Sequence, residues 1–172
     1  MPPIHHIQIE PADASQLIDL RHDVLRTNLP REAAYFEGDN APDTQHFAAF
    51  HQDHQTIIGC VTLLNRPFTL FPETDITEDF QADYAELLPI LQTQAHQLRG
   101  MAVHPDYRNH GVGALLLNHV HDQCARQNQY LWCNARERAM PFYLRHDWIR
   151  ISNIFDIPTA GAHYQLCKPP AP

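Results

Sequence analysis

A short stretch with two glycines, Arg108–Ala114, holds the residues best suited to binding an anion. It lies between a strand-like run, Leu98–Val103, and a helix-like run, Val112–Gln127. A loop that opens a helix presents backbone N–H groups and the positive end of the helix dipole, which suits phosphate oxygens. Glycine lets the backbone approach a ligand because it has no Cβ, and Arg108 adds a permanent forked cation. The spacing Arg-x-x-Gly-x-Gly/Ala matches neither the Gly-x-Gly-x-x-Gly dinucleotide pattern nor the Walker pattern, so the usual nucleotide sites are excluded.

The elements that must position this loop follow from hydrophobic spacing. From residue 97 onward the expected order is strand, glycine loop, helix, strand, helix, strand, strand. Further helices are expected after Pro11 and over Asp83–Leu91, where Pro89 limits the length. Asn134 with Glu137 three residues later resembles an N-terminal helix cap. Strands are predicted over residues 4–10, 45–51, 55–65, 98–103, 129–133, 148–155 and 163–168.

Composition restricts the class of protein. A chain of 172 residues with 44% hydrophobic and 19% charged residues is expected to form one globular domain over residues 1–172. The four cysteines have no C-x-x-C spacing and are predicted to be small buried hydrophobes rather than disulfide partners. No apolar run could span a bilayer and no secretory signal precedes the first strand, so we expect a cytoplasmic protein that does not contact membranes.

Charge is unevenly distributed along the chain. A net charge of -8 argues against a nucleic-acid-binding protein, although the arginines concentrate in the C-terminal half, which is compatible with an anionic cofactor. The segment Thr69–Gln94 contains no Lys or Arg but six acids, namely Glu73, Asp75, Glu78, Asp79, Asp83 and Glu86. Such a run is either a solvated acidic excursion or a lip that attracts a cationic amine.

Two motifs resemble those of a known enzyme family. Leu98–Arg108 is similar to a central strand followed by Val-x-Pro-x-x-Arg, and the glycine loop comes next. Asn134–Trp148 is similar to a second motif with Asn, Ala, Phe-Tyr, three residues and Gly-Phe. In their order and in the elements between them, these motifs resemble the GCN5-related N-acetyltransferases (GNAT). Asp147 stands where the family pattern has glycine, and this difference is expected to alter a turn rather than the chemistry.

The resemblance implies an α/β fold (α+β in stricter usage): a mixed, largely antiparallel sheet of about six or seven strands flanked by about four helices. The two central strands, Leu98–Val103 and Gln129–Cys133, would splay apart to admit coenzyme A. An acyl-coenzyme A core would span about residues 95–150, and variable acceptor-side segments about residues 11–45 and 69–94. The implied activity is acetyl transfer from acetyl-coenzyme A, as co-substrate, to a primary amine by direct attack in a ternary complex.

Individual residues take roles from the same resemblance. Around Ala102, the backbone groups of Met101 and Val103 would pair with the pantetheine arm as a further strand would. Asn134 would hydrogen-bond the pantetheine or cap a helix. Tyr143 would protonate the leaving thiolate, or else pack as a core aromatic beside Phe142. The pyrophosphate would meet Arg108 and the N–H groups of Asn109, His110, Gly111, Val112, Gly113 and Ala114.

The sequence does not identify the general base that would take the proton of the amine. Gln97 stands where many relatives carry glutamate, and an amide cannot accept the proton, so His96, Glu137, an acid of the 69–94 segment or bulk water would serve instead. The alternative function is an inactive acyl-coenzyme A sensor that has lost transfer. The oligomeric state is also open, a homodimer included.

Metal and hydrolase chemistry are not indicated. The closest of the 13 histidines are pairs, such as His119 with His121, and no third ligand lies at zinc-finger or metalloprotease spacing, so no metal site is predicted. No Gly-x-Ser-x-Gly is present, and the cysteines lack a flanking catalytic motif.

Overall fold

The computed structural model describes residues 7–51 and 55–170, which form two compact units. The first unit holds the described residues up to Leu64 together with Leu98–Gln123, and the second holds Asn65–Gln97 together with those from Cys124 onward. Residues 4–6 of the first expected strand and the expected turn at 52–54 lie outside the described residues.

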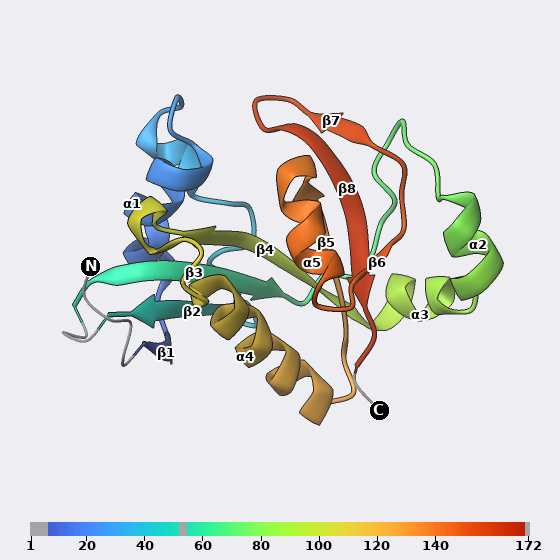
Figure 1. Ribbon diagram of the computed structural model, residues 1–172, viewed down its shortest axis with the longest axis horizontal. Coiled ribbons are helices and arrows are strands. Elements are labelled where there is room, and N and C mark those ends of the chain that lie inside the picture. Colours follow the sequence, from blue (N-terminus) through green and yellow to red (C-terminus); the bar gives the residue numbers. More distant parts are fainter. Residues whose placement is uncertain (1–6, 52–54, 171–172) are drawn as a thin grey trace. The chain divides into compact units, whose positions relative to one another are not determined.

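The first unit is built on antiparallel strands (Figure 1). Strand β2 pairs with β1 on one side and with β3 on the other, and the sheet order continues from β3 to β4. The elements are β1 (Gln8–Pro11), α1 (Ala14–Leu25), the short 3₁₀ helix η1 (Arg31–Ala34), β2 (Gln45–Phe50), β3 (Ile57–Leu64), the later part of β4 (Ala95–Val103), the 3₁₀ helix η2 (Pro105–Tyr107) and α4 (Val112–Arg126), which ends in the second unit.

Helices α1 and α4 pack on opposite faces of these strands (Figure 1). Leu17 of α1 belongs to a buried cluster with Ala48 and Cys60. The neighbours of those two strand residues face α4, since Phe47 contacts His119 edge-on at 4.7 Å and a Cβ on Gly59 would reach the α4 side chains. Because side chains alternate along a strand, α1 and α4 pack on opposite faces. Both helices were expected from their apolar spacing.

The second unit contains the start of β4, the two helices that precede it and the elements that follow α4. Ala95–Gln97 of β4 pairs in parallel with Tyr130–Trp132 of β5, and β8 pairs antiparallel with β5, β6 and β7. Its elements are α2 (Glu78–Tyr84), α3 (Leu87–Gln94), β5 (Tyr130–Arg136), the 3₁₀ helix η3 (Glu137–Ala139), α5 (Met140–Leu144), β6 (Ile149–Arg150), β7 (Phe155–Ile157) and β8 (Gly161–Lys168).

The expected fold class is confirmed, with eight strands and five α-helices in the described residues instead of six or seven and about four. The strand predicted over 148–155 is wrong in its middle, where it divides into β6 and β7. The N–H groups of Ile151 and Ser152 both donate to the Gln165 carbonyl, at 2.8 and 3.3 Å, and the Ser152 hydroxyl accepts the Gln165 N–H at 2.9 Å. This local arrangement replaces the regular ladder.

The single helix predicted over 83–91 is also wrong, because two helices, α2 and α3, occupy this segment. Thr77 caps α2 by accepting the Phe80 N–H at 3.2 Å. Pro89 lies in the first turn of α3, where its missing N–H removes no helical hydrogen bond. Pro89, which was expected to limit the length of a single helix, therefore lies near the start of α3.

All four cysteines are buried free thiols, as expected. Burial raises the pKa of Cys60 to about 11 and of Cys167 to about 12, so both stay protonated and unreactive at neutral pH. Over residues 7–51 and 55–170, no helix is long and apolar enough to span a membrane. In the same part of the chain, no three His, Cys, Asp or Glu side chains gather in a group that could hold a metal ion.

Gly59 sets how closely α4 approaches β3. A Cβ at this position would lie 2.8 Å from Leu116 Cδ1 and 2.9 Å from Val112 Cγ1. We expect Gly59→Val to lower the free energy of unfolding in urea by about 1–3 kcal/mol, because α4 must move away from the strand, even though valine favours strands. A double-mutant cycle with Val112→Ala should show a compensating interaction. Additive effects would contradict this packing.

Candidate functional site

Strand β4 has a break in its regular conformation at Gly100, where φ is 59°. A Cβ there would lie 3.1 Å from both Arg21 Nε and Phe36 Cε2, so glycine is needed for its backbone conformation and for space. The Gly100 carbonyl accepts the Cys60 thiol at 3.4 Å. Beyond this break Ala102 faces the α1 cluster and is 3% exposed, so Met101 and Val103, both half-buried, face the other way.

The turn after β4 is held by local hydrogen bonds. The Tyr107 N–H donates to the His104 carbonyl at 2.9 Å, and the Arg108 N–H donates to the Pro105 carbonyl at 3.2 Å. The Arg108 side chain is exposed, and its Nε donates to the Val103 carbonyl at 3.3 Å. Arg108 therefore lies against the end of β4, beside the loop that follows.

The glycine loop alternates conformations before α4 begins. Asn109 and Gly111 have φ values of 61° and 83°, and His110 Nδ1 donates to the Arg108 carbonyl at 2.6 Å. The Gly111 carbonyl accepts the Leu115 N–H at 3.0 Å, as a residue that caps a helix N-terminus does. Arg108, before these left-handed residues, is extended, with φ of -68° and ψ of 154°. Left-handed residues in such a turn can direct neighbouring N–H groups towards one side, which favours the binding of an anion.

The electrostatics of the loop and of the α4 N-terminus also favour an anion. A Cβ on Gly111 would meet no atom within 4 Å, so the loop is open at this point and only its φ requires glycine. Helix α4, which is 15 residues long, carries no acid in its first turn. Acids usually occupy that turn because they offset the positive helix end. Without them, the positive end of α4 is left to a ligand, and the loop suits a phosphate or pyrophosphate.

Asn134 and Tyr143 lie in the second unit. The expectation that Asn134 caps a helix is wrong, because it belongs to β5 and the helical turn starts only at Glu137. Its Oδ1 accepts Gln165 Nε2 at 3.1 Å. Asn134 therefore faces a glutamine of β8, which also donates to the Thr69 carbonyl at 3.0 Å.

Tyr143 has the environment of a core aromatic residue. It is 6% exposed, and its ring lies 5.4 Å from Phe142 and 5.1 Å from Trp148. Burial, together with Cys133, raises the pKa of Tyr143 well above its usual value of 10. The phenol therefore keeps its proton at neutral pH, which a proton donor requires.

Asp147 takes the left-handed conformation that glycine would, with φ of 61°. The Asp147 N–H donates to the Leu144 carbonyl and the Trp148 N–H to the Tyr143 carbonyl, both at 3.2 Å. Asp147 therefore completes the left-handed end of α5, a conformation that Asp tolerates better than most residues.

Gln97, whose amide cannot act as the base, is buried at 7% exposure, and its Oε1 has no hydrogen-bond partner among the described residues. A buried carbonyl oxygen without a partner is an acceptor for water or for a ligand N–H. Glu137 is exposed at the start of η3, and His96, half-buried, precedes Gln97 on β4.

A buried polar network on α1 went unrecognised in the sequence. Arg21 is fully buried and forms an ion pair with Asp39 at 2.6 Å, and its Nη2 donates to Thr62 Oγ1 at 2.5 Å. His46 Nε2 donates to the Asp39 carbonyl at 2.8 Å, and its Nδ1 accepts the Thr62 hydroxyl at 2.7 Å. The sequence did contain a sign of this network. Arg21 follows Leu17 by one helical turn, which places a charge on the apolar face of the helix.

The structure thus assigns the expected site residues to two groups. Met101–Val103 and Arg108–Ala114 follow one another in the first unit, along β4 and into α4. Asn134 and Tyr143 belong to the second unit, on β5 and α5.

Comparisons with known proteins agree with this architecture. The model of the Acetyltransferase (GNAT) family matches residues 14–148. A Bacillus subtilis (strain 168) protein described as "Uncharacterized N-acetyltransferase YitI" is 23% identical over 163 residues, covering 94% of this chain and 95% of that protein. The crystal structure of Escherichia coli ElaA is similar in fold, with a TM-score of 0.68, 15% identity, and coverage of 95% of this chain and 99% of that one.

A structure of an aminoglycoside 6'-N-acetyltransferase complexed with coenzyme A is also similar. It has a TM-score of 0.64 and 13% identity, with coverage of 96% of this chain and 98% of that one. At this identity the likeness concerns the fold alone.

Gly111 and Gly161 form a matched pair for testing the loop, since each has φ of 83° and open space around a Cβ. We expect Gly111→Val and Gly161→Val to lose comparable stability in urea, about 1–3 kcal/mol, because valine is strained at this φ. Only Gly111→Val, or Arg108→Glu, should weaken coenzyme A binding by tenfold or more in calorimetry. Equal affinity in Gly111→Val and Gly161→Val would remove the loop from the binding site.

Proposed function

We propose that this chain, which belongs to the GNAT acetyltransferase family, transfers an acetyl group from acetyl-coenzyme A to a primary amine in a ternary complex. The observation that carries the proposal is the loop Arg108–Ala114. Its left-handed residues and the acid-free N-terminus of α4 form an anion site directly after a strand whose regular conformation is broken at Gly100.

The cofactor would lie along β4 and the loop that follows it. The pantetheine amides would pair with the backbone N–H and C=O groups of Met101 and Val103, as an added strand does. The pyrophosphate would bind the N–H groups of residues 109–114, with Arg108 turning from the Val103 carbonyl to the phosphate. Gly59 contributes indirectly, because it lets the first turn of α4 settle on β3.

Transfer requires one bond to form and one to break. The amine nitrogen attacks the thioester carbon, the C–S bond breaks, and the sulfur leaves as a thiolate that must be protonated. Tyr143 would serve as the hydrogen-bond and proton donor at that sulfur. With a pKa well above that of a thiol, which is about 8.5, Tyr143 helps most while charge is still developing on sulfur.

An alkyl ammonium must lose a proton before it attacks, because its pKa is about 10.4. Gln97 cannot take this proton, yet its unpartnered Oε1 can accept an N–H of the acceptor and orient it. Deprotonation would fall to His96, to Glu137, to an acid of the 69–94 segment or to solvent water.

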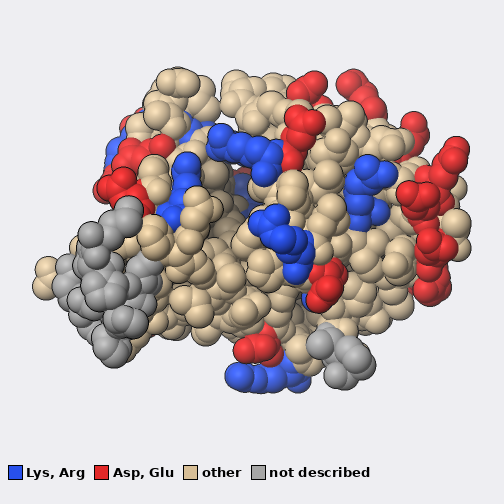
Figure 2. Space-filling model, viewed as in Figure 1, with Lys and Arg blue, Asp and Glu red and all other residues tan. Residues whose placement is uncertain are grey.

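The preferred acceptor is a cationic amine. All three acids of α2, Glu78, Asp79 and Asp83, are exposed, and Figure 2 shows acidic side chains gathered over the part of the molecule where Figure 1 labels this helix. A surface of one sign raises the local concentration of an oppositely charged substrate.

An acyl-coenzyme A sensor without turnover is the second candidate, and the amide at Gln97 in place of a carboxylate is the feature that favours it. Thiol release with a panel of amines separates the two functions. A protein that binds acetyl-coenzyme A and releases no thiol with any amine would be the sensor.

Tyr143→Phe tests the chemical step. We expect kcat to fall about 100-fold, with little change in the Michaelis constant for acetyl-coenzyme A, because only the proton donor is lost. Since the pKa of Tyr143 is raised, the wild type should show no loss of kcat from phenol ionisation as pH rises to about 10.

The matched control is Tyr84→Phe, the same change at an exposed tyrosine of α2, which should leave kcat unchanged. If Tyr143→Phe keeps full activity between about pH 6 and pH 10, Tyr143 is not the donor.

Neutralising α2 tests the acceptor preference. The triple variant Glu78→Gln, Asp79→Asn, Asp83→Asn should raise the Michaelis constant of an alkyl ammonium several-fold at low salt, and the effect should shrink at high salt. An arylamine that is uncharged at the assay pH serves as the control substrate. An unchanged Michaelis constant for the ammonium would count against electrostatic attraction by this helix.

A further inference from the structure

Three arginine side chains of the first unit gather around the ring of Phe36. The guanidinium carbons of Arg21, Arg26 and Arg99 lie 4.7, 4.9 and 4.8 Å from the ring centroid. Arg21 belongs to α1, Arg26 ends that helix as its C-cap, and Arg99 belongs to β4. Each distance suits a cation–π interaction, but cations that share one ring repel one another unless anions offset their charge. We call these three side chains the arginine cluster.

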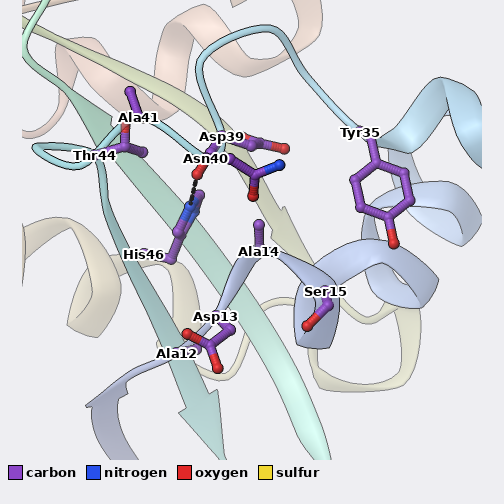
Figure 3. A pocket seen from close by; sticks show the side chains of 10 residues that line it. All are labelled: Ala12, Asp13, Ala14, Ser15, Tyr35, Asp39, Asn40, Ala41, Thr44 and His46. Atoms are coloured by element: carbon purple, nitrogen blue, oxygen red, sulfur yellow. Dashed lines mark hydrogen bonds between the residues drawn. The ribbon is translucent and has the colours of Figure 1, made fainter.

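The position of Phe36 is fixed by the loop that carries it. Its N–H donates to Asp39 Oδ2 at 2.9 Å, and its carbonyl accepts the Asp39 N–H at 3.1 Å. Figure 3 shows Asp39 beside His46 of β2, whose Nε2 donates to the Asp39 carbonyl at 2.8 Å. A Cβ on Gly100 would lie 3.1 Å from Phe36 Cε2, so the ring also rests against β4 at its break. The arginine cluster is therefore preorganised beside that strand.

The chain supplies acidic residues beside two of the three arginines. Asp39 Oδ2 lies 2.6 Å from Arg21 Nη1 in a buried ion pair. Arg99 Nη1 donates to the Glu37 carbonyl at 2.9 Å, so an acidic residue also lies next to Arg99.

Arg26 has no such counterpart. It forms no ion pair with an acid among residues 7–51 and 55–170, and of its five side-chain N–H donors one, on Nη1, bonds the Leu25 carbonyl at 2.9 Å. The side chain is half-buried, and burial lowers the pKa of Arg26, with no carboxylate to raise it. Partial removal of a cation from water is unfavourable, and an anion from a ligand would offset this cost.

The arginine cluster lies where the reactive end of the cofactor is expected. The proposed pantetheine runs from the loop at 109–114 back along Val103 and Met101. The next residues in that direction are Gly100 and Arg99. The thioester, and the amine that attacks it, would therefore lie towards the arginine cluster and away from the pyrophosphate.

We propose that Arg26 binds a carboxylate of the acceptor, so that the substrate is an amine that also carries a carboxylate, as an amino acid does. The planar fork of a guanidinium matches the two oxygens of a carboxylate. The inference rests on the proposed acetyl transfer and specifies its acceptor. A basic amino acid, which keeps a net positive charge, also satisfies the preference for a cationic amine.

Arg26→Gln tests this assignment, with amino acids and their methyl esters as paired acceptors. We expect the ratio of Michaelis constants, free acid over ester, to rise tenfold or more, because only the free acid loses a charge-assisted hydrogen bond. Arg26→Lys, which keeps the charge but not the fork, should recover part of this loss. Because Arg26 also lies at the negative end of α1, a purely structural role would change both constants alike. An unchanged ratio therefore overturns the inference.

The matched control is Arg31→Gln, the same change at an exposed arginine of η1 whose Nη2 lies 2.6 Å from Asp19. It should leave the ratio unchanged. A rise equal to that in Arg26→Gln would mean that the effect is not specific to Arg26, and it would overturn the inference too.

A binding measurement separates this inference from the proposed function, since it needs neither thioester nor turnover. In the NMR spectrum, the Nε–H resonance that disappears in Arg26→Gln should shift when acetate is added and stay in place with acetamide. If acetate shifts it and no amine is acetylated, the carboxylate site stands and acetyl transfer fails. If amines are acetylated and the ratio is unchanged in Arg26→Gln, acetyl transfer stands and the inference fails. Where no amine is acetylated, a resonance that acetate leaves in place overturns the inference.

Discussion

The ion pair between Arg21 and Asp39 is the constraint around which the first unit is arranged. Both side chains are almost fully buried, so removing one partner would leave the other charge buried and unpaired. The free energy of unfolding would fall by about 3–5 kcal/mol. The pair fixes the loop before β2 to α1, and Thr62 extends it to β3. On β4, a Cβ on Gly100 would lie 3.1 Å from Nε of the same arginine, so a larger residue there would press on the buried guanidinium.

Beyond that break, the proposed cofactor site depends on backbone conformation more than on side chains. Gly111 and Asn109 adopt left-handed φ values, and α4 begins without an acid to offset its dipole. Both features favour an anion, and neither requires a particular side chain apart from glycine at Gly111. Arg108 is engaged with the Val103 carbonyl, which suggests that binding of a phosphate involves a small side-chain movement rather than a rearrangement of the loop.

The local part of this arrangement could be predicted from the sequence. The loop and the helix after it follow from glycine spacing and apolar periodicity over neighbouring residues. The contacts of Arg21 with Asp39 and Thr62 could not, because they join segments far apart in the chain. The strand position of Asn134 was missed for a similar reason: its local pattern resembles a cap, while pairing with Gln165 on β8 keeps the segment extended.

The central claim is that coenzyme A binds along β4 and the loop that leads into α4. A crystal structure of the protein with coenzyme A bound tests it most directly. We expect the pyrophosphate oxygens to lie within hydrogen-bonding distance of the N–H groups of residues 109–114, with the pantetheine beside Met101 and Val103. A complex in which the pyrophosphate binds elsewhere and this loop touches no part of the cofactor would contradict the claim.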